Sequence, residues 1–270
     1  MAKEIKEHKE IDYCIRGEGE NNLPELIHSI ESGNEESIER IKGVCYKGEE
    51  EISCNPLELI TELDSIPFPN YDKFELNRYS SFPKHLYILT SRGCPFNCIY
   101  CSIGFIMGRK FRARSPKNVV DEIEHMSTKY GTSFFEFRDD NFAFDVKRAK
   151  QICERIISKD LNIKWCADIR VDRIDEELVG LMKESGCIRL DIGIESTNNE
   201  ILRNLRRDMT REQIERGISL IKKHKIPIKG YFIIGFPEET CKDAISSLEF
   251  AIRKDLDEVS FYMLIPYPGT

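Results

Sequence analysis

The sequence predicts an α/β fold, a partial parallel (β/α)6 barrel preceded by a small N-terminal α+β unit. From residue 84 onward, short apolar runs alternate with segments of helical periodicity, which is typical of a parallel sheet whose strands are joined by helices. Residues 56–83 contain four prolines and are predicted to form an extended linker. Residues 1–55 offer only a few short elements. A length of 270 residues suits one substantial domain with a small appendage.

The N-terminal unit is predicted to contain one strand, one helix and one hairpin. The strand is expected at residues 11–16, the helix at 23–30, and the hairpin at 44–46 and 51–53. Asn22 is expected to cap the helix, and Pro24 falls in its first turn. Glu18 and Glu20 precede this helix, and the sequence leaves open whether they cap it or line a junction between domains.

The barrel unit, residues 84–270, is predicted to hold six strands separated by five helices. The strands are expected at residues 86–90, 133–138, 163–169, 188–194, 228–236 and 258–265. Ser115 and Gly131 mark the two ends of the first helix, and Thr210 begins the fourth. The apolar face of the fifth helix consists of Ala244, Ile245, Leu248 and Ile252. The usual barrel of this type has eight strand–helix units, and the lack of a sixth helix is interpreted as truncation.

The carboxyl ends of the predicted strands carry polar or glycine-containing sequences, and in such barrels this edge holds the active site. These sequences are Asp139-Asp140-Asn141, the run from Asp168 to Asp172, Gly193-Ile194-Glu195-Ser196 and Gly235-Phe236-Pro237. Each alone is typical of a helix cap or a turn. Together at one mouth they favour a functional site.

Three cysteines, Cys94, Cys98 and Cys101, follow the first barrel strand within eight residues. This spacing suits three irons of a 4Fe–4S cluster and leaves the fourth iron open, whereas most such clusters use four thiolates. Zinc is the alternative ion. A structural zinc site needs a fourth ligand, and His125 is the nearest histidine downstream. A non-catalytic, zinc-stabilised α/β scaffold is therefore a second hypothesis.

Composition restricts the other classes of function. The chain has 40 Lys and Arg against 47 Asp and Glu, and this net charge of −7 argues against nucleic acid as the main partner. No apolar run approaches the roughly 20 residues of a membrane span. The N-terminus is too charged for a secretory signal, so the ten cysteines indicate a reducing cytoplasm. The basic run at 109–114 is expected to be solvated or paired with acidic residues.

The remaining cysteines are predicted to be free thiols. Cys14, Cys45 and Cys54 are spread over about forty residues, which favours isolated thiols over metal ligands. Four others are expected to be buried in helices and strands: Cys153, Cys166, Cys187 and Cys241.

The cysteine loop, with Tyr100 just before its last cysteine, resembles the signature of the radical S-adenosylmethionine (SAM) superfamily. Gly193-Ile194-Glu195-Ser196 resembles the ribose-side motif of these enzymes, and residues 230–237 resemble their adenine-side motif. Within the superfamily, the class with an N-terminal cobalamin-binding domain is the most similar. The features shared with that class are Gly17-Glu18-Gly19-Glu20, residues 63–67, residues 108–116, Asp139-Asp140-Asn141-Phe142 and residues 266–270.

The resemblance implies an oxygen-sensitive 4Fe–4S cluster on the three cysteines and reductive cleavage of SAM to a 5′-deoxyadenosyl radical. The substrate would be an unidentified small molecule undergoing methyl transfer or cyclase-type chemistry, with an electron donor such as a ferredoxin or flavodoxin. Asp139 or Asp140 is expected to accept the SAM amino group, Arg170 to bind the carboxylate, and Glu195 to bind the ribose. The adenine is expected near Tyr100, Ile234 and Gly235.

The chain also departs from that class. Cobalamin is a candidate cofactor, but the cobalt-ligating Asp-x-His-x-x-Gly motif is absent from the sequence. Residues 1–55 are therefore interpreted as the remnant of a cobalamin-binding domain. Glu238 and Asp208 occupy positions where the family commonly has glycine, which bears on the substrate side of the site. A truncated and inactive member of the family is a further alternative.

Overall fold

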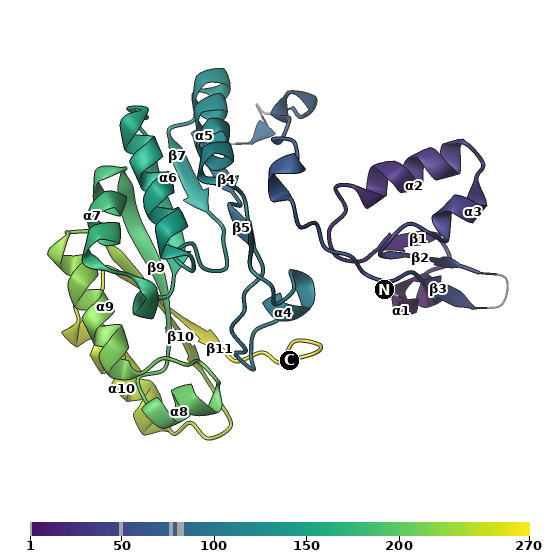
Figure 1. Ribbon diagram of the computed structural model, residues 1–270. Coiled ribbons are helices and arrows are strands. Elements are labelled where there is room, and N and C mark those ends of the chain that lie inside the picture. Colours follow the sequence, from purple (N-terminus) through teal and green to yellow (C-terminus); the bar gives the residue numbers. More distant parts are fainter. Residues whose placement is uncertain (1, 49–50, 76–77, 80–83) are drawn as a thin grey trace.

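The computed structural model describes residues 2–48, 51–75, 78–79 and 84–270. Its main feature is a six-stranded parallel sheet in the order β11-β10-β9-β8-β7-β4 (Figure 1). The strands are β4 (His85–Ile88), β7 (Phe134–Phe137), β8 (Lys164–Ile169), β9 (Cys187–Glu195), β10 (Ile228–Ile234) and β11 (Glu258–Met263). Among the described residues, β4 and β11 are the two edges of this sheet. The predicted six-stranded partial barrel is confirmed.

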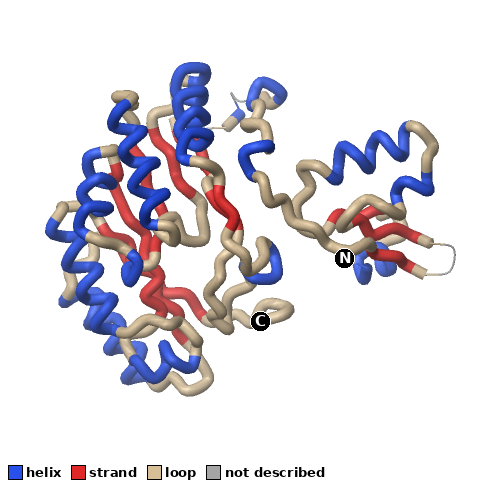
Figure 2. Tube along the Cα trace, viewed as in Figure 1, coloured by secondary structure: helices blue, strands red, loops and turns tan. Residues whose placement is uncertain are grey.

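Helices cover the outer face of this sheet (Figure 2). They are α5 (Pro116–Tyr130), α6 (Val146–Ser158), α7 (Glu176–Glu184), α8 (Asn199–Asn204), α9 (Arg211–Lys223) and α10 (Cys241–Arg253). The predicted caps of α5 and α9 are confirmed. The Ser115 side chain accepts a hydrogen bond from the Asn118 N–H, and Gly131 ends α5 in the left-handed conformation. Thr210 and Gln213 form a capping box at the start of α9. Within the described residues, no helix is both long and apolar enough to cross a bilayer.

The two faces of the sheet differ in chemistry. Toward the helices, Phe135, Phe137 and Trp165 are fully buried, and the rings of Phe137 and Trp165 stack with centroids 5.0 Å apart. The opposite face carries Asp168 and Asp191, which are paired neighbours on β8 and β9. The strands therefore place the apolar core on the outside of the barrel and polar side chains on its inside.

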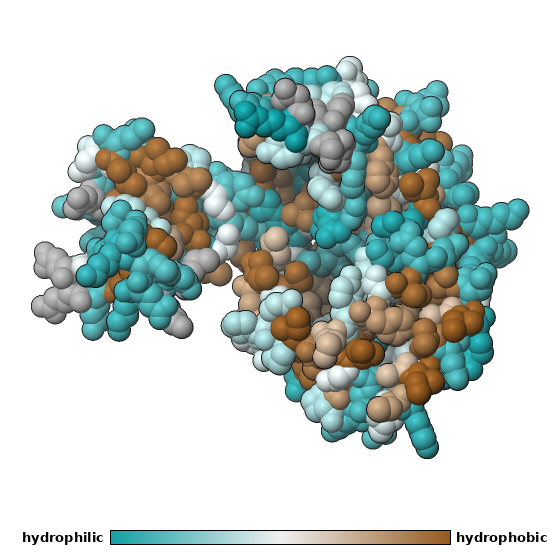
Figure 3. Space-filling model, turned by 180° about the vertical axis from the view of Figure 1, so that it is seen from behind, coloured by the Kyte–Doolittle hydropathy of each residue, from teal (hydrophilic) through white to brown (hydrophobic). Residues whose placement is uncertain are grey.

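The predicted apolar face of α10 was wrong. Ile245, Leu248 and Ile252 are 56%, 46% and 69% exposed, and the buried residues include Phe250 and Ala251 instead. Seen from behind, hydrophobic side chains are exposed on the lower part of the barrel unit, where α10 and β11 lie (Figure 3). α10 therefore packs on the sheet through the face that contains Phe250 and Ala251. The predicted apolar face is not covered by any of the described residues.

The N-terminal residues form a separate three-stranded antiparallel sheet. Its strands are β1 (Tyr13–Ile15), β2 (Val44–Lys47) and β3 (Ile52–Cys54), and its helices are α1 (Ala2–Glu7), α2 (Asn22–Glu31) and α3 (Glu35–Ile38). The predicted strand, helix and hairpin are confirmed, although residues 49–50 of the hairpin turn lie outside the described part. Asn22 is not the N-cap of α2. It lies inside the helix, and its side chain donates to the Lys42 carbonyl oxygen at 2.8 Å.

Two cysteines of the hairpin form a disulfide, Cys45–Cys54. The expectation of isolated thiols was therefore wrong for this pair. The hairpin register places the two residues directly opposite each other on β2 and β3, although they are nine residues apart in sequence. The prediction of buried thiols is confirmed for Cys153, Cys166 and Cys187, whereas Cys241 is exposed.

The linker joins the two units through short 3-10 turns, η1 (Leu63–Ser65) and η2 (Tyr71–Lys73). Pro83 and residues 76–77 and 80–82 lie outside the described residues. Glu18 lies at the junction. Its carboxylate binds Arg112 at 2.8 Å and Arg92 at 3.0 Å and accepts the Ile60 N–H. Burial raises the pKa of Glu18, but these hydrogen bonds bring it below its ordinary value.

Candidate active site

The three cysteines of the predicted cluster lie on a loop closed by a short antiparallel pair, β5 (Ser91–Arg92) and β6 (Arg112–Ala113). Within this loop, α4 (Ile103–Ile106) follows the last cysteine. Gly93 has a φ of +83°, and a Cβ there would collide with the carbonyl oxygens of Lys110 and Gly108. The Cys94 N–H donates to the Gly108 oxygen at 3.3 Å. Glycine thus lets the two ends of the loop meet closely.

All three thiols line one cavity of about 470 Å³ at the carboxyl ends of the strands. Burial raises the pKa of the Cys94 and Cys101 thiols, and the neighbouring thiols and Asp140 add to this shift. A positively charged metal group would counteract that shift, because thiolates rather than thiols bind metals.

A cluster and a single zinc ion place different demands on the three thiols. Among the residues that the structure describes, no three His, Cys, Asp or Glu side chains are grouped so that they could hold one metal ion. A zinc ion lies about 2.3 Å from each thiolate, so its ligands must converge on one point. In a 4Fe–4S cluster each thiolate binds a different iron, which keeps the sulfur atoms apart. The donor set fits a cluster better, and the zinc-scaffold alternative is not favoured.

The two adjacent aspartates of the β7 strand end have different surroundings. Asp139 is buried, and its carboxylate accepts hydrogen bonds from the Ser91 N–H, from Ser91 Oγ at 2.6 Å and from Thr90 Oγ1 at 2.9 Å. Asp139 thereby fixes the chain segment that leads into the cysteine loop. Asp140 faces the cavity. Burial and the charge of Asp139 raise the pKa of Asp140 to about 6, against the effect of the Gly93 N–H.

Arg170 follows β8 and also lines the cavity. Its guanidinium pairs with Asp172 at 3.0 Å and donates to the Arg207 carbonyl oxygen at 2.9 Å. It lies over the Phe96 ring, 3.7 Å from the centroid. Its Nη1 atom is buried without a hydrogen-bond partner. Because an unpartnered buried donor is costly, this atom is suited to bind an anionic group of a ligand.

Glu195 and Tyr100 meet on the other side of the cavity, together with a residue that the sequence did not single out, Arg207. The Arg207 guanidinium lies 3.5 Å from the Glu195 carboxylate, and it donates to the Gly193 carbonyl oxygen at 2.6 Å. Burial raises the pKa of Glu195, while Arg207 and the Tyr100 hydroxyl act in the opposite direction. A Cβ at Gly193 would lie 2.5 Å from the Glu195 carboxylate, so this pair requires glycine there.

Ile234 and Gly235 are not among the residues that line the cavity. The Gly235 N–H donates to the Glu239 carboxylate at 2.5 Å, and the Ile234 carbonyl oxygen accepts the Leu264 N–H. The positive φ of Gly235, +91°, explains the glycine, but its surroundings are open. The structure thus brings the three cysteines, Tyr100, Asp139, Asp140, Arg170 and Glu195 to one cavity and leaves these two residues beside it.

Sequence reasoning placed Asp168 in a strand-end run without assigning it a role, and it did not single out Asp191. Asp168 lines the same cavity, and burial, together with the charge of Asp191, raises its pKa to about 7. Asp191 itself is paired with Arg189 at 2.6 Å and accepts the Tyr231 hydroxyl at 3.0 Å. The alternation of polar and apolar residues along β8 and β9 was the available signal, because a barrel interior without function is filled by apolar side chains.

The sequence contains only a weak indication that Arg207 is a site residue. It precedes Asp208, the position at which the sequence departs from the family pattern of a basic residue followed by glycine. Its neighbours Arg203 and Arg206 are exposed, whereas Arg207 is 8% exposed. Only the fold distinguishes it from a solvated basic run.

The basic run at 109–114 was expected to be solvated or paired with acidic residues. Two of its arginines are paired: Arg112 with Glu18 and Arg114 with Glu122.

The chain is similar in sequence to known proteins. Residues 88–251 match the sequence profile of the Radical SAM superfamily. An uncharacterised methyltransferase of Pyrococcus horikoshii is 36% identical over 263 residues, which is 96% of this chain and 57% of that protein. An anaerobic magnesium-protoporphyrin IX monomethyl ester cyclase of Rubrivivax gelatinosus is 30% identical, over 98% of this chain and 49% of the cyclase. The chain thus spans about half the length of these relatives.

Solved structures show the same fold. The radical SAM methyltransferase TsrM from Kitasatospora setae, with tryptophan substrate and a SAM analogue bound, superposes with a TM-score of 0.80 and 21% identity. The match covers 93% of this chain and 51% of TsrM. The cobalamin-dependent radical SAM enzyme OxsB superposes with a TM-score of 0.76 and 23% identity, over 90% of this chain and 36% of OxsB. The profile match, which covers more than half of this chain with its cysteine-lined cavity, shows that the chain belongs to the radical SAM superfamily.

Proposed function

We propose that the chain binds a 4Fe–4S cluster through Cys94, Cys98 and Cys101 and cleaves SAM reductively at the adjoining cavity. The observation that carries this proposal is the convergence of the three thiols with Asp140, Arg170 and Glu195 on one cavity. When bound, the cluster supplies the electron that breaks a carbon–sulfur bond of SAM. The protein residues bind and orient SAM.

Each end of SAM has a partner in this proposal. Arg170 binds the carboxylate through its unpartnered Nη1 atom. Asp140 accepts hydrogen bonds from the amino group, because both oxygens of Asp139 are already used by Ser91 and Thr90. Glu195 binds the ribose hydroxyls, and Arg207 holds its carboxylate in place and lowers its pKa against the effect of burial.

The substrate is a small molecule, and the reaction that follows SAM cleavage is methyl transfer or a cyclase-type reaction. The support for this is the set of relatives, which includes methyltransferases and magnesium-porphyrin cyclases. We assign no cobalamin ligand to this chain, since none of its five histidines lies in the Asp-x-His-x-x-Gly context. A reduced ferredoxin or flavodoxin is the proposed class of electron donor.

The proposal is tested by turnover of SAM without any substrate. Anaerobically reconstituted protein, reduced with dithionite, is expected to release 5′-deoxyadenosine and methionine. Cys98→Ala is expected to reduce this release to the background level, because one cluster ligand is lost. Cys241→Ala, which removes an exposed thiol on α10, is the matched control and should cleave SAM as the wild type does. Equal cleavage by Cys98→Ala and wild type would exclude the proposed site.

The role of Asp140 predicts a loss of SAM affinity. Asp140→Asn keeps the shape of the side chain but removes a charge-assisted hydrogen bond, so the Kd for SAM should rise about tenfold. Equilibrium dialysis of reconstituted protein with radiolabelled SAM measures this Kd. Asp255→Asn, at an exposed position, is the control. Unchanged affinity in Asp140→Asn, with unchanged iron content, would show that another group accepts the amino group.

A further inference from the structure

Three cysteines of the N-terminal sheet lie in one row across its strands. Cys14 on β1 is directly opposite Cys45 on β2, and Cys45 is directly opposite Cys54 on β3. Directly opposite residues of an antiparallel sheet carry their side chains on the same face. The Cys45 side chain therefore has a sulfur-bearing neighbour on each side, one bonded to it and one free.

The face that carries the row is covered by α1. The flanking residues Ile15, Val44 and Tyr46 belong to the small apolar core with α2 and α3, so the cysteines point to the opposite face. There α1 packs against all three strands, and its Ile5 is 1% exposed. In Figure 1 the sheet lies between α1 on one side and α2 with α3 on the other. Cys45 is fully buried, Cys14 half-buried and Cys54 exposed.

The register allows a second bridge, between Cys14 and Cys45. The Arg16 N–H donates to the Gly43 carbonyl oxygen at 2.9 Å, which makes this a hydrogen-bonded pair of the β1–β2 ladder. Two residues further along, Cys14 and Cys45 form the next pair of the same type, with an expected Cα–Cα distance of about 5.5 Å. Disulfides commonly join Cα atoms about 4.4–6.8 Å apart. Opposite residues of a hydrogen-bonded pair hold their Cβ atoms about 5.5 Å apart, and a disulfide needs about 3.5–4.5 Å, so the two strands must approach by about 1 Å to accept this bond.

We propose that Cys14, Cys45 and Cys54 form a thiol–disulfide exchange site in which Cys45 is bonded to either of its neighbours. The Cys14 thiolate attacks Cys45 Sγ from the side opposite Cys54, which is the in-line approach that exchange requires. A Cys14–Cys45 bond forms, the Cys45–Cys54 bond breaks, and Cys54 leaves as a thiolate. Cys14 gives its proton to solvent and Cys54 takes one up. The step involves no net oxidation or reduction, so it needs no external oxidant or reductant.

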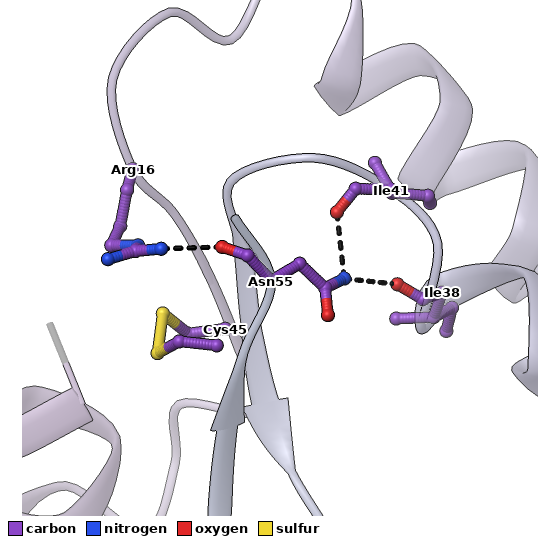
Figure 4. Close-up of a disulfide and its surroundings, with 6 residues drawn as sticks. Arg16, Ile38, Ile41, Cys45 and Asn55 are labelled. Atoms are coloured by element: carbon purple, nitrogen blue, oxygen red, sulfur yellow. Dashed lines mark hydrogen bonds between the residues drawn. A yellow bond between two sulfur atoms is a disulfide. The ribbon is translucent and has the colours of Figure 1, made fainter. Parts of the chain in front are cut away.

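The exchange moves the free thiol from a half-buried position to an exposed one. Cys54 borders a groove of about 960 Å³ that also includes Glu18 and Arg92, the ion pair at the junction. The next residue, Asn55, accepts a hydrogen bond from Arg16 and donates to the Ile38 and Ile41 carbonyl oxygens at 2.8 Å (Figure 4). These bonds hold the backbone around Cys54 in either state, so the exchange alters the sulfur atoms and leaves the sheet intact.

Disulfide mapping tests this site in the full-length chain. The protein is kept anaerobically at about pH 8, free thiols are blocked with iodoacetamide after an acid quench, and trypsin places the three cysteines on separate peptides by cutting after Arg16, Lys42 and Lys47. We expect both the Cys45–Cys54 and the Cys14–Cys45 peptide pairs in the wild type. In Cys54→Ser, treated with oxidised glutathione, we expect a Cys14–Cys45 bridge and loss of Cys14 alkylation. Exposed Cys241 should be alkylated in the wild type that is kept without glutathione.

Two results would overturn the proposal. One is a wild type that contains only the Cys45–Cys54 bridge over several hours. The other is a Cys54→Ser variant in which Cys14 and Cys45 carry glutathione or alkyl groups but never join. Circular dichroism with an unchanged thermal midpoint shows that each variant is folded. Cys14→Ser, which should keep the Cys45–Cys54 bridge, confirms that the mapping detects it.

Discussion

Arg207→Met is expected to lower the free energy of unfolding by about 3–5 kcal/mol, because it leaves the buried Glu195 carboxylate without its charged partner. Arg207 also donates to the Gly193 carbonyl oxygen at 2.6 Å, and that acceptor would lose its bond. Urea unfolding of the wild type and the variant, followed by circular dichroism, measures the difference. Binding of SAM should weaken as well, since loss of Arg207 would raise the pKa of Glu195 further and leave its carboxylate without the partner that holds it in place.

The control for this prediction is Arg203→Met, four residues earlier on the exposed side of α8. It makes the same chemical change and should alter the free energy of unfolding by no more than about 0.5 kcal/mol. The double variant Arg207→Met/Glu195→Gln should recover part of the stability, because no buried charge remains. A loss in Arg207→Met no larger than in Arg203→Met would show that the Arg207–Glu195 pair is not a buried ion pair.

Asp168→Asn is expected to stabilise the protein at about pH 8 but not at about pH 4. The pKa of Asp168 is raised to about 7 in the folded chain, against about 4 when unfolded. Between these values the folded state binds more protons than the unfolded state, so wild-type stability falls as pH rises, and the loss is complete above about pH 7. The largest possible gain is about 4 kcal/mol, and water in the cavity reduces it.

Thermal unfolding of both proteins across this pH range measures the effect. The difference in midpoint should be small at about pH 4 and should grow up to about pH 7. Asp191, Glu136, Arg138 and Arg189 all act on Asp168, so the control must leave them unchanged. Asp255→Asn, at an exposed loop position, meets this condition and should show no such trend. A pH-independent difference for Asp168→Asn would contradict the raised pKa.

The barrel elements could be predicted because their signals are local. All six strands were found, since each is a short apolar run between glycine or helix-capping residues. The capping residues Ser115 and Thr210 act as predicted, because a cap depends only on the residues three positions further on. The cavity containing the three thiols, Asp140, Arg170 and Glu195 followed from one topological rule, that parallel strands end at one edge.

The features that were missed depend on contacts between distant residues. Cys45 and Cys54 are joined because of the hairpin register, which two cysteines in a sequence do not reveal. Arg207 differs from exposed Arg203 and Arg206 only by its burial against Gly193. The stripe on α10 has the correct period, yet periodicity does not say which face the neighbouring strands cover.

Low-temperature electron paramagnetic resonance tests most directly whether Cys94, Cys98 and Cys101 hold a 4Fe–4S cluster with one open iron. Anaerobically reconstituted and reduced protein should contain about four irons per chain and show a 4Fe–4S signal that shifts when SAM is added, because SAM binds the open iron. Replacing all three cysteines by alanine should abolish the iron and the signal. Iron retained by the triple variant, or a wild-type signal unaffected by SAM, would contradict the assignment.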